Sequence, residues 1–110
     1  MSDELRIGFF NVRTTDKDAV LLYLLREVIP EKSSGLTIVF AATRHHVEYI
    51  MTLLKCADLN PVMIYGQMDM DSRKANLHAF RSGKSPILVV TDVAARGIDV
   101  PMIDNVIHHR

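Results

Sequence analysis

Three apolar segments of the chain each end in residues that could hold a ligand. The segments and the residues that follow them are 36–41 with Thr43, 61–65 with Gly66, and 86–90 with Thr91 and Asp92. A threonine hydroxyl can donate a hydrogen bond to a phosphate oxygen, and a glycine lets a backbone approach a ligand closely. Helix N-termini after such segments add free N–H groups. If the three ends meet, they predict a site that holds a phosphate chain through several weak contacts.

Each of these residues also has a purely structural explanation. Threonine before a helix commonly caps that helix, and glycine after a strand commonly forms a turn. Asp92 could favour a helix N-terminus through its charge alone. Only the grouping of three such ends favours a ligand, so both interpretations stay open on the residues alone.

A further polar group follows the third segment, in the sequence Arg-Gly-Ile-Asp at 96–99. Gly97 permits a positive φ, and Arg96 and Asp99 come close together in a short connection. An ion pair between Arg96 and Asp99 and a contact with a ligand are both compatible with this spacing.

The segments that must position these residues alternate between two hydrophobic periods. Continuous apolar runs predict strands at 36–41, 61–65, 86–90 and 103–108, and a further strand is expected at 5–12. Amphipathic patterns between the runs predict helices. The clearest has apolar residues at i, i+3, i+4 and i+7, which are Val47, Ile50, Met51 and Leu54.

Strands that alternate with helices predict βαβ units, a parallel sheet and a three-layer α/β fold. A helix is expected to begin near Asp69 or Asp71, to direct Leu77 and Phe80 inward, and to end at Gly83 in a left-handed conformation. In an open parallel sheet, ligands bind beyond the carboxyl ends of the strands. The polar residues that follow the strands are therefore expected on one edge.

Composition limits the class of protein. The 110 residues suit one domain, and the formal net charge of zero gives no basic footprint typical of nucleic-acid binding, although a local basic rim is compatible with it. No apolar run has the length of a membrane span, and the acidic N-terminus has no signal-peptide pattern, so secretion is not expected.

The cysteine and the histidines do not predict a metal site. Cys56 stands in an apolar helical stretch, and we expect a buried, inert thiol. The histidines have no spacing typical of a ligand set. We expect His45 and His46 on an exposed helix start, and His108 and His109 exposed at a strand end.

Three motifs resemble those of DEAD-box ATP-dependent RNA helicases. The sequence T-D-V-A-A-R-G-I-D-V-P at 91–101 resembles motif V, T-I-V-F-A-A-T at 37–43 resembles motif IV, and Y-G-Q-M-D-M-D-S-R-K-A-N-L-H-A-F at 65–80 resembles motif IVa. Their order and spacing also agree. The resemblance covers nearly the whole chain and implies a RecA-like fold, with residues 1–110 forming part of the second RecA-like domain of such an enzyme.

The resemblance also implies roles by position. The residues expected to contact RNA phosphates and riboses are Thr43, Gly66, Arg73 and Thr91. Gly97 and Asp99 are expected to approach the ribose of ATP, and Asp92 and Arg96 to brace motif V. Such contacts read the RNA backbone rather than its sequence. ATP and magnesium are expected in the full-length enzyme, with neither bound to this chain alone.

The chain departs from the family pattern in two respects. Met70 stands where motif IVa usually has glutamine, so an amide hydrogen bond is expected to be lost or replaced. The arginine-rich H-R-x-G-R-x-G-R segment and the N-terminal RecA-like domain are absent from the sequence. We therefore expect no catalytic residue here, no activity of the chain alone, and the N-terminal domain of the same protein as a partner beside single-stranded or structured RNA.

The phrases F-F-N-V-R at 9–13 and A-T-R-H-H-V-E-Y at 42–49 resemble the nucleolar branch of the family, which takes part in assembly of the large ribosomal subunit. A nuclear, nucleolar location is implied. A RecA-like module that only docks a protein is an alternative function. A dinucleotide-binding enzyme is a poor fit, because no G-x-G-x-x-G follows any predicted strand. Exposure of the 103–108 strand also predicts some dimer at high concentration.

Overall fold

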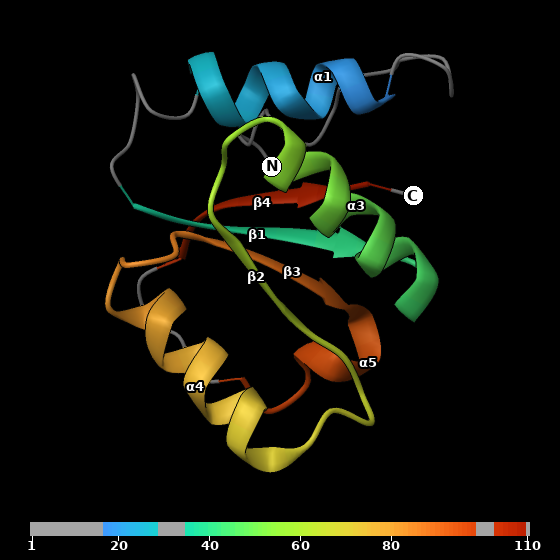
Figure 1. Cartoon of the computed structure of the whole chain (residues 1–110), viewed down its shortest axis with the longest axis vertical. Coiled ribbons are helices and arrows are strands. Elements are labelled where there is room, and N and C mark those ends of the chain that lie inside the picture. Colours follow the sequence, from blue (N-terminus) through green and yellow to red (C-terminus); the bar gives the residue numbers. More distant parts are fainter. Residues whose placement is uncertain (1–16, 29–34, 99–102, 110) are drawn as a thin grey trace.

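Four parallel strands form the central sheet (Figure 1). The computed structural model describes residues 17–28, 35–98 and 103–109. The strands are β1 (Leu36–Ala41), β2 (Pro61–Ile64), β3 (Ile87–Thr91) and β4 (Ile103–His108), in the order β2-β3-β1-β4. This confirms the expected α/β fold with a parallel sheet. Four strands are described where about five were expected, and the strand expected at 5–12 lies outside the described residues.

Helices cover both faces of the sheet and complete the three layers. They are α1 (Lys17–Tyr23), the π-helical turn η3 (Leu24–Val28), α3 (Arg44–Cys56), α4 (Met70–Arg81) and α5 (Asp92–Ala95). The first three pack on one face, and α4 and α5 pack on the other (Figure 1). Among the described residues, no helix is long and apolar enough to span a membrane.

Helix α3 begins after Thr43, whose hydroxyl accepts a hydrogen bond from the His46 N–H at 3.2 Å. The four apolar residues predicted to form its inner face are all buried, at Val47, Ile50, Met51 and Leu54. The helical period therefore decided which face of α3 packs on β1 and β3.

Helix α4 begins after Asp69, whose carboxylate accepts from the Ser72 N–H at 2.9 Å. Its Phe80 is fully buried against the second face of the sheet, and Leu77 is half-buried beside it. The helix is followed by Gly83 at a φ of +83°. A left-handed φ favours glycine, so the expected C-terminal signal is confirmed.

Alternation along the central strands divides the core in two. Val39 of β1 and Val89 of β3 face α1 and α3, whereas Leu88 and Val90 of β3 face α4 and α5. Both central strands are covered on both sides, which explains their continuous apolar sequences.

The expectation of a buried thiol at Cys56 was wrong, because this residue is exposed. It is the last residue of α3 and follows the buried Leu54 by two positions. Two positions turn a helix by about 200°, which directs the thiol away from the sheet. The apolar neighbours of Cys56 in the sequence did not reveal this orientation.

Candidate functional site

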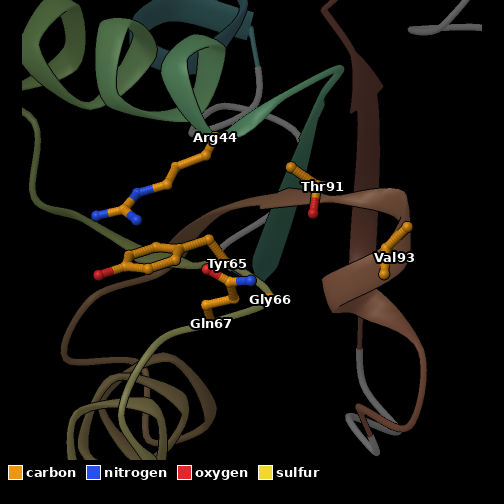
Figure 2. Close-up of a pocket in the computed structure, with 6 residues that line it drawn as sticks. All are labelled: Arg44, Tyr65, Gly66, Gln67, Thr91 and Val93. Carbon is orange, nitrogen blue, oxygen red and sulfur yellow. The ribbon is translucent and has the colours of Figure 1, made fainter.

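The carboxyl ends of β1, β2 and β3 meet at one edge of the sheet. Ala41 of β1 is in register with Thr91 of β3, and Ile64 of β2 is in register with Val90. Beyond these ends lies an open pocket of about 220 Å³. Its lining residues come from all three strand ends (Figure 2) and are Arg44, Tyr65, Gly66, Gln67, Thr91 and Val93.

Thr91 lies in this pocket and also caps the short helix α5. Its hydroxyl oxygen accepts from the Ala94 N–H at 3.3 Å. A hydroxyl has one donor besides its acceptor lone pairs. The capping geometry therefore leaves the Thr91 O–H proton able to donate to a ligand in the pocket, so the structural explanation and the ligand explanation are compatible.

Thr43 is at the same edge but does not line the pocket. Its side chain is exposed, and its hydroxyl caps α3. Because it directly precedes Arg44, which does line the pocket, Thr43 lies beside the pocket rather than within it.

Gly66 has no steric reason within the described structure to be a glycine. It is exposed, an added Cβ would meet nothing within 4 Å, and its φ is outside the left-handed region. Gly83 and Gly97, in contrast, have φ values of +83° and +79°. Within the described residues, neither steric crowding nor a left-handed φ explains Gly66, which lies in the turn after β2.

Arg44 and Tyr65 form one wall of the pocket, and the sequence interpretation did not predict the contact between them. The Arg44 guanidinium carbon lies 4.2 Å from the centroid of the Tyr65 ring, and Arg44 Nε lies 3.4 Å from a Glu48 carboxylate oxygen. A cation over an aromatic face is held by the ring quadrupole. Their positions immediately after β1 and β2 were the signal in the sequence that could have identified them.

Arg73 is half-buried on α4 and is not among the residues that line the pocket. Its Nη2 donates to the Ala94 carbonyl oxygen of α5 at 3.3 Å. This contact joins α4 to the helix that begins at the pocket residue Thr91. One donor of the guanidinium is thus used, and a guanidinium has five.

The remaining predicted residues lie after β3. Asp92 is the first residue of α5, and Arg96 is exposed at its end. Gly97 adopts a left-handed φ, which by itself favours glycine. Asp99 and its possible ion pair with Arg96 lie outside the described residues. The described part of this connection therefore fits an exposed turn and does not by itself build a nucleotide pocket.

No cluster of three or more metal-ligating side chains occurs among the described residues. His45 is exposed as expected and His46 is half-buried, whereas the expectation for His109 was wrong: it is only 8% exposed. The alternation of β4 turns Asn105, Ile107 and His109 toward the inner face, while His108 is exposed and stacks on Phe40. Met70 is exposed at the first turn of α4.

The chain matches the family of the helicase conserved C-terminal domain over residues 16–110. It is 45% identical over 108 residues to the putative DEAD-box ATP-dependent RNA helicase 29 of Arabidopsis thaliana, and 43% identical over 109 residues to ATP-dependent RNA helicase DDX54 of Mus musculus. These alignments cover 98% and 99% of this chain but 12% of each relative. The chain thus spans about an eighth of the length of these relatives.

Solved structures agree with this similarity. The DEAD-box protein SrmB of E. coli, bound to regulator of ribonuclease activity A, superposes with a TM-score of 0.78 at 30% identity, over 89% of this chain and 55% of that one. Dbp5 of S. cerevisiae, bound to RNA and ADP BeF3, gives a TM-score of 0.77 at 28% identity, over 89% of this chain and 24% of that one.

Proposed function

This chain belongs to the helicase conserved C-terminal domain family, as a second RecA-like domain of the DEAD-box type, and from that premise we propose that its strand-end edge binds the backbone of a single RNA strand. Thr43, Gly66, Arg73 and Thr91 are the proposed RNA contacts, and the pocket adds Arg44 and Tyr65. The full-length protein is proposed to be an ATP-dependent RNA helicase.

The observation that carries this proposal is Gly66 at the mouth of the pocket. None of the described residues crowds this position, whereas a sugar-phosphate backbone that passed close to the turn would require a glycine there. Beside it, Thr91 offers a hydroxyl proton and Arg44 a positive charge. Hydrogen-bond donors and positive charges bind the phosphates and riboses of RNA. They recognise the RNA backbone and not the base sequence.

The Gly66→Ala variant tests the proposal. We expect unchanged thermal stability, because the added methyl meets open space, and weaker binding of a single-stranded oligouridylate. Nuclear magnetic resonance titration of amide shifts measures weak binding directly and reports the same residues in both proteins. Equal affinity of the variant and the parent chain would contradict close approach of RNA at this turn.

The nucleotide part of the proposal rests on the family. We propose that Gly97 and Asp99 approach the ATP ribose, that Asp92 and Arg96 brace the motif V segment, and that ATP and magnesium are held together with the N-terminal RecA-like domain. The residues described here supply no magnesium ligand cluster. The resemblance places the phosphate loop and the magnesium-binding carboxylates in that N-terminal domain, so we propose that the chain alone is inactive.

The cellular part of the proposal also rests on resemblance. Relatives carrying the names ATP-dependent RNA helicase DBP10 and DDX54 support a role in RNA remodelling. We propose a nucleolar location and a role in assembly of the large ribosomal subunit, as the phrases at 9–13 and 42–49 imply. Fluorescence microscopy of the tagged full-length protein tests this, and a location outside the nucleus would contradict it.

Self-association at high concentration stays a prediction. Strand β4 is at the edge of the described sheet, and its Val106 is 42% exposed. An exposed apolar residue on a strand favours pairing between copies. Sedimentation velocity measures this, and a single monomer boundary at every concentration would contradict it.

Loss of a protein partner without any RNA phenotype in an Asp99→Ala variant would instead favour the protein-docking alternative.

A further inference from the structure

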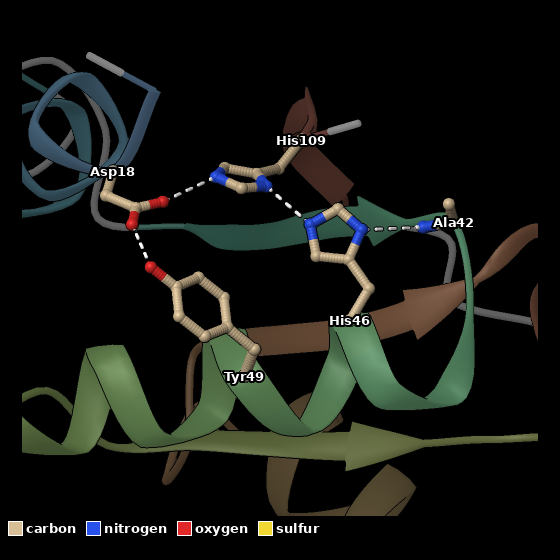
Figure 3. A network of polar contacts seen from close by, with 5 residues as sticks. All are labelled: Asp18, Ala42, His46, Tyr49 and His109. Carbon is tan, nitrogen blue, oxygen red and sulfur yellow. Dashed lines mark hydrogen bonds and ion pairs between the residues drawn. The ribbon is translucent and has the colours of Figure 1, made fainter. Parts of the chain in front are cut away.

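A continuous chain of hydrogen bonds connects α1 to the turn between β1 and α3 (Figure 3). Ala42 N lies 3.1 Å from His46 Nδ1, and His46 Nε2 lies 2.7 Å from His109 Nδ1. His109 Nε2 lies 3.0 Å from one carboxylate oxygen of Asp18. The Tyr49 hydroxyl donates to the other oxygen of Asp18.

The backbone N–H of Ala42 determines which atom donates in each of these hydrogen bonds. A backbone N–H can only donate, so His46 Nδ1 accepts from Ala42 and carries no proton. The proton of neutral His46 is then on Nε2, which donates to His109 Nδ1. His109 must in turn carry its proton on Nε2 and donate to Asp18. Both imidazoles are therefore neutral and share one tautomer, as the partner of each ring nitrogen requires.

This series of hydrogen bonds lies where three elements meet beside the pocket. His109 is buried directly after β4, Asp18 belongs to α1, and His46 belongs to the first turn of α3. The bond to Ala42 fixes the backbone immediately before Thr43 and Arg44. One hydrogen-bonded chain thus joins three elements to the segment that brings Arg44 to the pocket.

We propose that His46 and His109 are positioning residues, which hold the Ala42–Arg44 turn through a one-directional relay that opens when either imidazole is protonated. A proton on His46 Nδ1 would face the Ala42 N–H, and a proton on His109 Nδ1 would face the His46 N–H. Either change places two donors against each other and breaks a bond. Only the effect on RNA rests on the proposed function.

The charges around the relay favour the neutral form of His46. Burial lowers the pKa of His46 first, the neighbouring His109 and Lys17 lower it further, and Asp18 opposes them. The hydrogen bond to Asp18 raises the pKa of the Tyr49 hydroxyl, which agrees with Tyr49 as the donor. The lowered pKa of His46 favours a closed relay at neutral pH, and protonation of His46 itself requires more acid conditions than protonation of an ordinary histidine.

The tautomers can be measured on the 110-residue chain. Two-bond nitrogen–proton spectra of ¹⁵N-labelled protein at pH 7.5 are expected to show His46 and His109 each as a fixed Nε2–H tautomer. His45 is the internal control: its side chain is 96% exposed, its ring contacts only Glu48 at 3.9 Å among the ion pairs of the described residues, and an averaged tautomer pattern is expected for it. An averaged pattern or an Nδ1–H tautomer at His46 would overturn the relay.

Two variants of similar shape distinguish the roles of the two ring nitrogens of His46. Asparagine places its amide oxygen near the Nδ1 position, so His46→Asn keeps an acceptor for Ala42. Glutamine places its amide nitrogen near the Nε2 position, so His46→Gln keeps the donor to His109 and loses that acceptor. We expect amide hydrogen exchange at Ala42 to accelerate about tenfold in His46→Gln and to change little in His46→Asn. Equal exchange in both would overturn the proposal.

Binding of a single-stranded oligouridylate at pH 7.5 and pH 5.5 tests the functional step. Acid conditions are expected to weaken binding by the parent chain relative to His46→Asn, whose acceptor does not titrate. His45→Ala controls for the general gain of positive charge. If Ala42 exchange follows pH as expected while RNA affinity does not, the relay stands and the assignment of this edge to RNA fails.

Discussion

At the scale of single residues, the sequence predicted which positions meet but not what each side chain does there. Thr91 and Gly66 lie together in the pocket because parallel strands point their carboxyl ends the same way. Arg44 over Tyr65 could not be foreseen, because that contact depends on where β2 lies relative to the turn after β1. His109 was misjudged because strand alternation continues one residue past β4.

The charge at the pocket gives a prediction with a matched control. Arg44→Ala and Lys84→Ala each remove one exposed cation, but Lys84 precedes β3 and therefore lies at the opposite edge of the sheet. We expect Arg44→Ala to weaken binding of single-stranded RNA several-fold, about 1–2 kcal/mol for a lost cation–base or cation–phosphate contact. Fluorescence anisotropy at low salt measures both variants. An equal loss in the two would mean that only net charge matters.

At the scale of elements, long amphipathic patterns were reliable and short connections were not. The inner face of α3 was predicted residue by residue, because burial against the sheet imposes the helical period. Residues 17–28 begin as the α-helix α1 and change to a π-helical turn at Leu24, while Leu21, Leu24 and Leu25 all stay buried. The amphipathic pattern of this segment did not predict the change in helical geometry.

The link between α4 and α5 gives a prediction at this scale. Arg73→Ala removes both the bond to Ala94 and a donor proposed for RNA phosphate. If Arg73 also contacts a phosphate, the slope of log affinity against log salt should decrease by about 0.7, the value per phosphate for single strands. Unchanged affinity over the salt series would contradict the phosphate role. Weaker binding with an unchanged slope would assign Arg73 to holding α5 alone.

At the scale of the whole molecule, the two faces of the sheet contribute different contacts to the edge that holds the pocket. The face under α4 and α5 supports the pocket residues that follow β2 and β3. The face under α1 and α3 carries the histidine relay, which reaches the same edge from the other side. Polar contacts from both layers of the molecule therefore converge on this edge of the sheet.

The relay also makes the stability of the whole molecule depend on pH. Because the pKa of His46 is lowered in the folded state, the unfolded chain binds this proton first as pH falls below 6.5, the ordinary pKa of a histidine. The free energy of unfolding should therefore be constant above that pH and decrease between 6.5 and the lowered pKa. Urea denaturation at steps from pH 7.5 to 5 measures it.

A second group titrates in a separate window, which keeps the two effects apart. The hydrogen bonds from Ser72 lower the pKa of Asp69 at the start of α4. Its contribution is therefore present above 3.8 and is lost only as pH falls below that value. His46→Asn should flatten the stability curve between pH 7.5 and 5 and leave the decrease below pH 4 intact. A curve for this variant that still matches the parent chain near pH 6 would show that His46 does not control the acid response.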